Sequence, residues 1–209
     1  MPVPTDADYV LVSLTTGPAS ATLSPADRDR VFRGHMASNH RLFAAGQLLV
    51  AGPFLRPTDP NRRGMFVLDV ADADAARAIV ETDPGVAEGV FRAECCAVRG
   101  PRTLRMASAL QRDALAALGA VHHDPESPPP NLRTYVYATA PSEDRLLALP
   151  LTRAILTLRF RTNETAVAIL DAERVEEIMP HVNPTFAASI TLDHWMSTTS
   201  LARLPRPAE

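Results

Sequence analysis

Lysine is absent from this sequence of 209 residues, so all 21 basic side chains are arginines. Without lysine the chain cannot form a Schiff base, and it lacks the residue that contacts phosphate in Walker-A loops and protein kinases. The net charge of −3 also provides no basic field for a nucleic-acid backbone. The composition therefore predicts a globular protein that does not bind a nucleic acid.

Cysteine is almost absent as well, and the two that occur, Cys95 and Cys96, are neighbours. Adjacent residues of a strand point to opposite faces, so this pair neither forms an ordinary disulfide nor converges on a metal. No run approaches the roughly 18 apolar residues of a membrane span, and the N-terminus lacks a basic and apolar signal segment. We expect no metal, no membrane partner and a reducing, cytoplasmic location.

Turn and capping signals give the first half of the chain a βαββαβ pattern. Ser24 and Pro25 begin a helix that is expected to end near Ala45. Asp72 begins a second helix that is expected to end near Thr82. The expected strands are residues 9–15, 48–54, 65–70 and 91–98. This order predicts an α+β fold with a ferredoxin-like unit.

A proline-rich segment at residues 122–132 follows a helical stretch at 103–118 and predicts an extended linker. A second set of elements follows it, with strands expected at 135–140, 155–161, 166–170 and 189–196 and helices at 142–149 and 172–179. The expected domains are residues 1–101, a helix and linker at 102–132, and a second ferredoxin-like unit at 133–209.

The two halves resemble each other where MFVLDVADADAARAIVETDPG is set against TAVAILDAERVEEIMPHVNPT. One register with a two-residue deletion matches three pairs of positions: Asp69 with Asp171, Asp83 with Asn183, and Glu94 with His194. We infer a duplicated domain. The competing interpretation is that βαββαβ patterns recur by chance in α+β chains.

Residues from Asp8 to Pro101 resemble the YciI-like (YCII-related) family of the dimeric α/β-barrel superfamily. His35, the following AAGQLLVAGP and the later TDPGVAEGVF carry the resemblance, because histidine, helix-ending glycine, A-G-P strand end and D-P turn occur in the family's order. The resemblance implies two ferredoxin-like units that pack their sheets into a barrel. It also implies that His35 and Asp83 form an active site.

In the second half the resemblance is degenerate, since the expected helix at 142–149 has no histidine and the aspartate position reads Asn183. The two halves are then expected to close one barrel as a monomeric pseudo-dimer, the alternative being a homodimer. Relatives in the superfamily include a dehalogenase of chlorinated hydroxymuconate and muconolactone isomerase. These relatives act on small oxygenated carbonyl compounds without a cofactor, which implies a reaction class but not a substrate.

Each proposed site residue also has a structural interpretation. His35 lies at the edge of an apolar helix stripe, where a packed histidine is common. Asp83 precedes Pro84 and Gly85 and is suited to accept backbone N–H groups in a turn. His40 is about 140° around the helix from His35 and is expected to be exposed.

Further candidates for substrate binding have weaker signals. Paired guanidinium hydrogen bonds suit a substrate carboxylate, although most loop arginines are merely solvated. Because side chains alternate along a strand, two residues of the first strand are candidates for lining a pocket. The single tryptophan is expected either in the core or in a pocket wall. These candidates are Arg56, Arg62 and Arg63, then Tyr9, Ser13 and Trp195. The histidines His122 and His123 lie in the proline-rich linker, and His181 has no carboxylate placed to orient it.

The preferred hypothesis is a cofactor-independent lyase or isomerase acting on a small carbonyl or lactone substrate. His35 would act as general base and Asp83 would orient it, and an enolate stabiliser of arginine, tyrosine or backbone N–H type would also be required. The alternative is a non-catalytic small-molecule-binding or accessory protein. In an enzyme, His35, Asp83 and an arginine should converge on one cavity.

Overall fold

Residues 5–120, 123–146 and 148–206 are described by the computed structural model of the chain. The first half contains β1 (Asp6–Thr16), α1 (Pro25–Ala44), β2 (Leu48–Leu55), β3 (Arg62–Leu68), α2 (Ala73–Val80), α3 (Pro84–Ala87) and β4 (Phe91–Pro101). The connection contains a 3-10 turn, η1 (Arg102–Met106), and α4 (Ala107–Ala117). The second half contains β5 (Leu132–Ala140), α5 (Glu143–Leu146), β6 (Ala154–Phe160), β7 (Ala166–Leu170) and β8 (Thr191–Thr198). Its 3-10 turns are η2 (Leu151–Arg153), η3 (Val175–Glu177), η4 (Met179–His181), η5 (Ala187–Ser189) and η6 (Thr199–Arg203).

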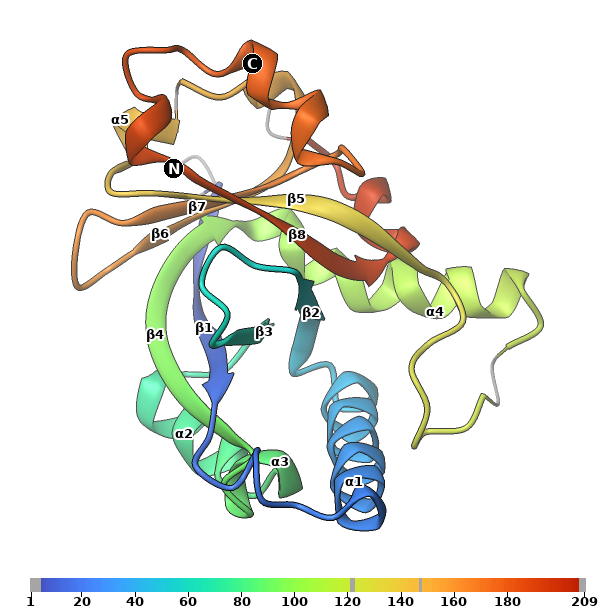
Figure 1. Cartoon of the computed structure of the whole chain (residues 1–209). Helices are drawn as coiled ribbons and strands as arrows, with labels where there is room; N and C mark the ends of the chain where they lie inside the picture. Colours follow the sequence, from blue (N-terminus) through green and yellow to red (C-terminus); the bar gives the residue numbers. More distant parts are fainter. Residues whose placement is uncertain (1–4, 121–122, 147, 207–209) are drawn as a thin grey trace.

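The strands form a closed antiparallel barrel in the order β1-β3-β2-β8-β5-β7-β6-β4 (Figure 1). Each half contributes four neighbouring strands, β4-β1-β3-β2 and β8-β5-β7-β6, and these two runs have the same order within their half. The halves join where β2 pairs with β8 and β4 pairs with β6. The prediction of a mixed α/β fold with a barrel is therefore confirmed, and all eight expected strands form, seven of them with shifted ends.

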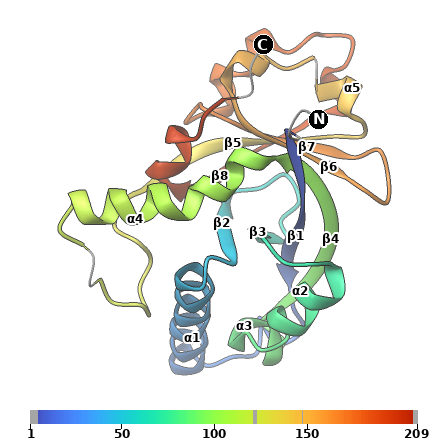
Figure 2. The same cartoon turned by 180° about the vertical axis from the view of Figure 1, so that it is seen from behind.

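Large apolar side chains fill the interior of the barrel. Tyr9 and Leu11 of β1 meet Tyr135, Tyr137 and Trp195 of the second half in one buried cluster. A second cluster lies under α1 and α2, and a third lies under α5 and the 3-10 turns. Figure 2 shows the helices of the first half on one side of the molecule and α5 on the other. The barrel interior is therefore a packed core.

Gly52 allows the two halves to meet closely at the β2–β8 seam. A Cβ atom at this position would come within 1.7 Å of the carbonyl oxygen of Met196, so a larger residue would separate the strands. The indole Nε1–H of Trp195 donates to the carbonyl oxygen of Gly52 at 2.9 Å. The glycine of the A-G-P motif thus serves the junction between the halves.

Equivalent tyrosines on β1 and β5 repeat one contact. Tyr9 donates its hydroxyl to the carbonyl oxygen of Pro101 at 3.0 Å, and Tyr135 donates to that of Thr198 at 2.7 Å. Tyr9 pairs with Val98 in the ladder and Tyr135 pairs with Trp195, so each acceptor lies three residues beyond the partner.

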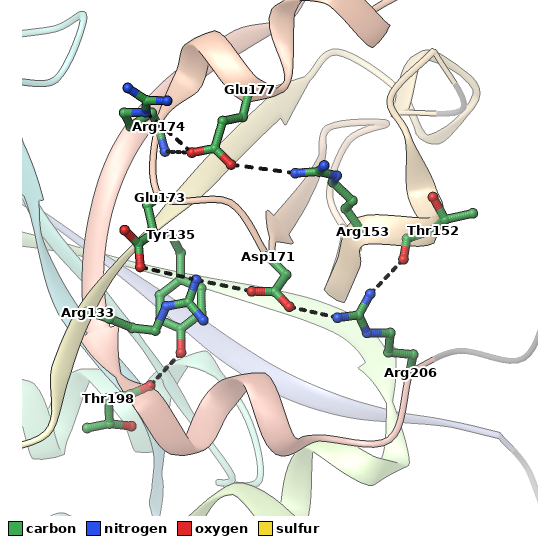
Figure 3. Close-up of polar contacts among 10 residues, drawn as sticks. All are labelled: Arg133, Tyr135, Thr152, Arg153, Asp171, Glu173, Arg174, Glu177, Thr198 and Arg206. Carbon is green, nitrogen blue, oxygen red and sulfur yellow. Dashed lines mark hydrogen bonds and ion pairs between the residues drawn. The ribbon is translucent and has the colours of Figure 1, made fainter.

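The matched aspartates Asp69 and Asp171 also repeat their contacts. Each donates its backbone N–H to the carbonyl oxygen of the residue just before the second strand of its half. The acceptor is Gln47 at 2.9 Å for Asp69 and Arg153 at 2.8 Å for Asp171. Each carboxylate binds an arginine that follows the fourth strand, at 2.7 Å in both cases: Arg105 in the first half and Arg206 in the second. Figure 3 shows the second of these pairs, together with Arg133 on the same carboxylate.

One part of the expected register is wrong. The ladders pair Val10 with Ala97 and Val136 with His194, which makes Ala97 rather than Glu94 the counterpart of His194. The fourth strand of the second half is therefore shifted by three residues from the expected register. A sequence match made without the ladder could not detect a deletion that falls in the loop before β8.

The helices of the second half are much reduced. The helix expected at 142–149 forms only the single turn α5. The prediction of a helix at 172–179 is wrong, because the 3-10 turns η3 and η4 occupy that segment. Pro180 has no N–H to donate to a helical carbonyl and restricts the residue before it. The Glu177 carboxylate also accepts the backbone N–H of Arg174, which favours a tight turn. No helix of the described residues is long and apolar enough to cross a membrane.

Candidate functional site

The structure brings His35 and Asp83 into direct contact. Nδ1 of His35 lies 2.9 Å from Oδ2 of Asp83, and both residues are buried. Asp83 caps the N-terminus of α3, and its Oδ1 accepts the backbone N–H of Gly85 at 2.8 Å. Since an ionised carboxylate only accepts hydrogen bonds, Nδ1 of a neutral His35 carries the hydrogen and Nε2 carries the lone pair.

Asn39 completes this group one helical turn after His35. Its Nδ2 lies 3.1 Å from Nε2 of His35, and its amide donates to the lone pair there. The sequence interpretation did not single out Asn39. The i, i+4 spacing on α1 places the two side chains side by side and was the available signal.

Gly34 lets α1 approach α3, and Gly85 lets α3 approach the Phe91 ring of β4. A Cβ at Gly34 would come within 2.8 Å of Cγ of Pro84, and one at Gly85 would come within 2.6 Å of the Phe91 ring. The Phe91 ring also packs in a T-shaped arrangement on His35, with centroids 5.5 Å apart. The RGH and DPG sequences therefore permit the approach that joins the imidazole to the carboxylate.

A cavity of about 720 Å³ opens beside His35 and Asn39. It lies between α1, the β2 and β3 strands, α4, the proline-rich segment and β8, so both halves and the connection between them form its walls. Asp83 does not line it. The imidazole thus turns Nδ1 toward the carboxylate behind it and contributes its other edge to the wall of the cavity.

The three candidate arginines all line this cavity, but they differ in their hydrogen-bond partners. Arg62 binds Asp193 at 2.7 Å, and its guanidinium stacks over the rings of Phe54 and Tyr137. Arg63 donates from Nε to the hydroxyl of Thr16 at 2.9 Å. Arg56 adopts φ 53°, and no hydrogen bond or ion pair links its side chain to another described residue.

The electrostatic character of the cavity follows from its walls. None of the described residues that line it carries a carboxylate, and the charge of Arg62 is already balanced by Asp193. Arg56 and Arg63 leave the walls with an excess of positive charge. The cavity therefore favours an anionic or electron-rich ligand.

Three of the candidate substrate-binding residues lie outside the cavity walls. Tyr9 and Trp195 are in the barrel core, and burial raises the pKa of Tyr9 to about 12. Ser13 lies on β1 between Met65 and Glu94 of the neighbouring strands. The structure therefore does not bring these three to His35.

The remaining histidines have separate surroundings. His40 is half-buried rather than exposed, because its ring meets that of His123 with centroids 5.5 Å apart at the cavity edge. His181 is exposed, His194 accepts the backbone N–H of Val175 at 3.4 Å, and His122 lies outside the described residues. In the part of the chain that the structure describes, no cluster of three or more His, Cys, Asp or Glu is arranged to hold a metal ion.

The second half repeats only the turn of this site. Asn183 accepts the backbone N–H of Thr185 at 3.0 Å, as Asp83 accepts that of Gly85. The four-residue α5 replaces the twenty-residue α1, and within the described residues no hydrogen bond joins Asn183 to a histidine.

Residues 9–94 match the family model of the YCII-related domain. The chain contains a YCII-related domain. The matched segment runs from β1 into β4 and includes His35, Asn39 and Asp83, so the resemblance inferred from the sequence is confirmed for this part of the chain. A search of curated proteins and a search of solved structures each gave no match.

Proposed function

We propose that the YCII-related domain catalyses proton transfer next to a carbonyl group of a small oxygenated carbonyl or lactone substrate. His35 is the general base through Nε2, and Asp83 fixes its tautomer and stabilises the imidazolium that forms. The observation that carries the proposal is the 2.9 Å contact between the two side chains, made beside a cavity that His35 lines.

The reaction class is a lyase or isomerase that uses no cofactor. The base removes a proton from the carbon next to the carbonyl, and the resulting enolate is reprotonated at another carbon, cyclises or expels a leaving group. Arg56 and Arg63 are suited to bind a carboxylate of the substrate, since they lie in the cavity wall without a carboxylate partner.

We further propose that the two halves descend from one duplicated unit and that the second half has lost its site. The same strand order, the paired tyrosine contacts and the paired aspartate contacts support this proposal. Since the barrel closes within one chain, a monomer is expected in solution.

A non-catalytic small-molecule-binding protein is the second candidate. The Asn39 amide donates to the lone pair of His35, which would suit a purely structural hydrogen-bond chain. In that case His35 would hold α1 against α3 and the cavity would only store a ligand.

Deuterium exchange separates the two candidates. A panel of lactones, hydroxylated acids and halogenated acids is incubated with the protein in heavy water, and deuterium at carbon is followed by NMR. We expect exchange with at least one compound, a loss of about 10²-fold or more in His35→Gln, and a smaller loss in Asp83→Asn. Exchange that survives His35→Gln would disprove the assigned base, and binding without any exchange would favour the second candidate.

A further inference from the structure

The proton transfer requires a group that stabilises negative charge on the carbonyl oxygen, and most of the expected donors are unsuitable. Arg62 is held by Asp193. The hydroxyls of Tyr9 and Tyr135 donate to backbone carbonyls, and Tyr137 is buried in the barrel core. Arg56 and Arg63 line the cavity but are assigned to the substrate carboxylate. Since a base alone contributes only about 10²- to 10⁴-fold, a further donor is needed beside it.

We propose that Asn39 is a further catalytic residue, whose side-chain amide donates a hydrogen bond to the enolate oxygen. This inference rests on the proposed function. In a carbonyl compound the acidic carbon and the oxygen are bonded to the same carbon, so the base and the donor must lie close together on the same wall of the cavity. Nε2 of His35 and Nδ2 of Asn39 are separated by 3.1 Å.

The second N–H of the Asn39 amide is available to a ligand. Nδ2 carries two hydrogens, and its one hydrogen bond to another described residue is the bond to His35. Asn39 lines the cavity beside His35, and α1 holds both side chains one turn apart. The apolar side chains of Phe32, Met36 and Phe91 also line the cavity, and such surroundings strengthen a hydrogen bond to a developing negative charge.

When the substrate binds, the acceptor of the Asn39 amide changes from Nε2 of His35 to the substrate oxygen. In the structure the amide donates to Nε2 of His35. When the substrate binds, its C–H bond faces Nε2, breaks and transfers the proton to nitrogen, and the electron pair forms C=C while the oxygen becomes negative and accepts from Asn39. The imidazolium returns the proton to another carbon in an isomerisation, or passes it to a departing group in an elimination, and no oxidant or reductant is consumed.

A phenolate probe tests this role without a known substrate. 4-Nitrophenolate carries its charge on oxygen attached to a planar carbon, as an enolate does, and 4-nitroanisole is its uncharged methyl ether. Binding of both is measured by absorbance or calorimetry to the whole protein and to Asn39→Leu, with Asn39→Ala as a second variant. Arg63→Met serves as the control for a general charge effect, and ¹⁵N NMR of His35 verifies that the dyad remains in place.

We expect both Asn39 variants to bind the phenolate at least tenfold more weakly and to bind the ether as before. We expect Arg63→Met to weaken the phenolate less. Equal phenolate affinity in wild type and Asn39 variants would overturn the inference, as would a wild type that does not prefer phenolate over ether. Failure of the proposed function is distinct, because it appears as absent deuterium exchange in the wild type, whatever the probe shows.

Discussion

Gly34 on α1 faces Pro84 on α3 so closely that a Cβ at Gly34 would lie 2.8 Å from Cγ of the proline. Glycine to alanine within a helix ordinarily stabilises by about 0.5–1 kcal/mol. Here we expect Gly34→Ala to lower the free energy of unfolding by about 1–3 kcal/mol, because the added methyl group forces the helices apart. Urea unfolding measures the change.

The matched control is Gly34→Ala combined with Pro84→Ala, which removes the Cγ atom that the new methyl group would meet. The double variant should recover part of the lost stability. The ¹⁵N shifts of His35 should also show loss of the single tautomer in Gly34→Ala and its return in the double variant. A stabilised single variant would mean that α1 and α3 can separate without cost to the dyad.

Asp193 and Arg62 join the two halves through an ion pair in which the carboxylate is buried and the guanidinium is partly exposed to the cavity. The Asp193 side chain is 2% exposed and also accepts from the backbone N–H and hydroxyl of Thr58. Asp193→Asn should destabilise the protein by about 3 kcal/mol, since it leaves the Arg62 guanidinium without its partner. Thermal or urea unfolding gives the value.

Arg62→Met provides the second arm of this cycle. The double variant with Asp193→Asn should be more stable than Asp193→Asn alone, because no unpaired charge stays among the aromatic rings. Strict additivity of the two changes would show that the pair contributes little coupling between the halves.

The sequence predicted the strands well because each one combines apolar residues with a clear turn at its end. The family resemblance also led to the expectation that His35 and Asp83 act together, and the structure places their side chains in contact. Asn39 was missed although its i, i+4 spacing was visible, because asparagine on a helix is unremarkable without the orientation of the imidazole beside it. The role of Arg62 could not be predicted, because its partner Asp193 lies 131 residues away.

Strand alternation also left one choice open. It shows that Tyr9 shares a face with its alternate neighbours, but not whether that face turns toward a cavity or toward the barrel core. The closure of the barrel decides this, and closure depends on the β2–β8 and β4–β6 seams. The helices of the second half were overpredicted because helical composition outweighed Pro180 in the interpretation.

Arg56 stands out among the non-glycine residues described, with a positive φ of 53°. A left-handed backbone costs an ordinary residue roughly 1 kcal/mol or more, and glycine adopts it freely. We expect Arg56→Gly to be more stable than Arg56→Ala by about 1 kcal/mol, because both remove the side chain and only glycine removes the strain. Equal stabilities in urea unfolding would show that the loop relaxes around residue 56.

The three tyrosines of the chain predict how stability changes at high pH. Burial raises the pKa of Tyr9, Tyr135 and Tyr137 from 10.0 to about 12 in each case. The folded protein therefore holds these protons more strongly than the unfolded chain does. By linkage the stabilisation is complete below pH 10 and is lost as the pH rises from 10 toward 12.

The near-ultraviolet absorbance of phenolate tests this prediction directly. In urea the phenolate signal should reach half of its maximum near pH 10, the ordinary value, whereas the folded protein at that pH should show almost none. As the pH increases further, the phenolate signal and the loss of circular dichroism should rise together, because ionisation of these side chains accompanies unfolding. Phenolate absorbance near pH 10 in a protein with native circular dichroism would mean that at least one tyrosine hydroxyl reaches solvent, and Tyr→Phe at each position would identify which.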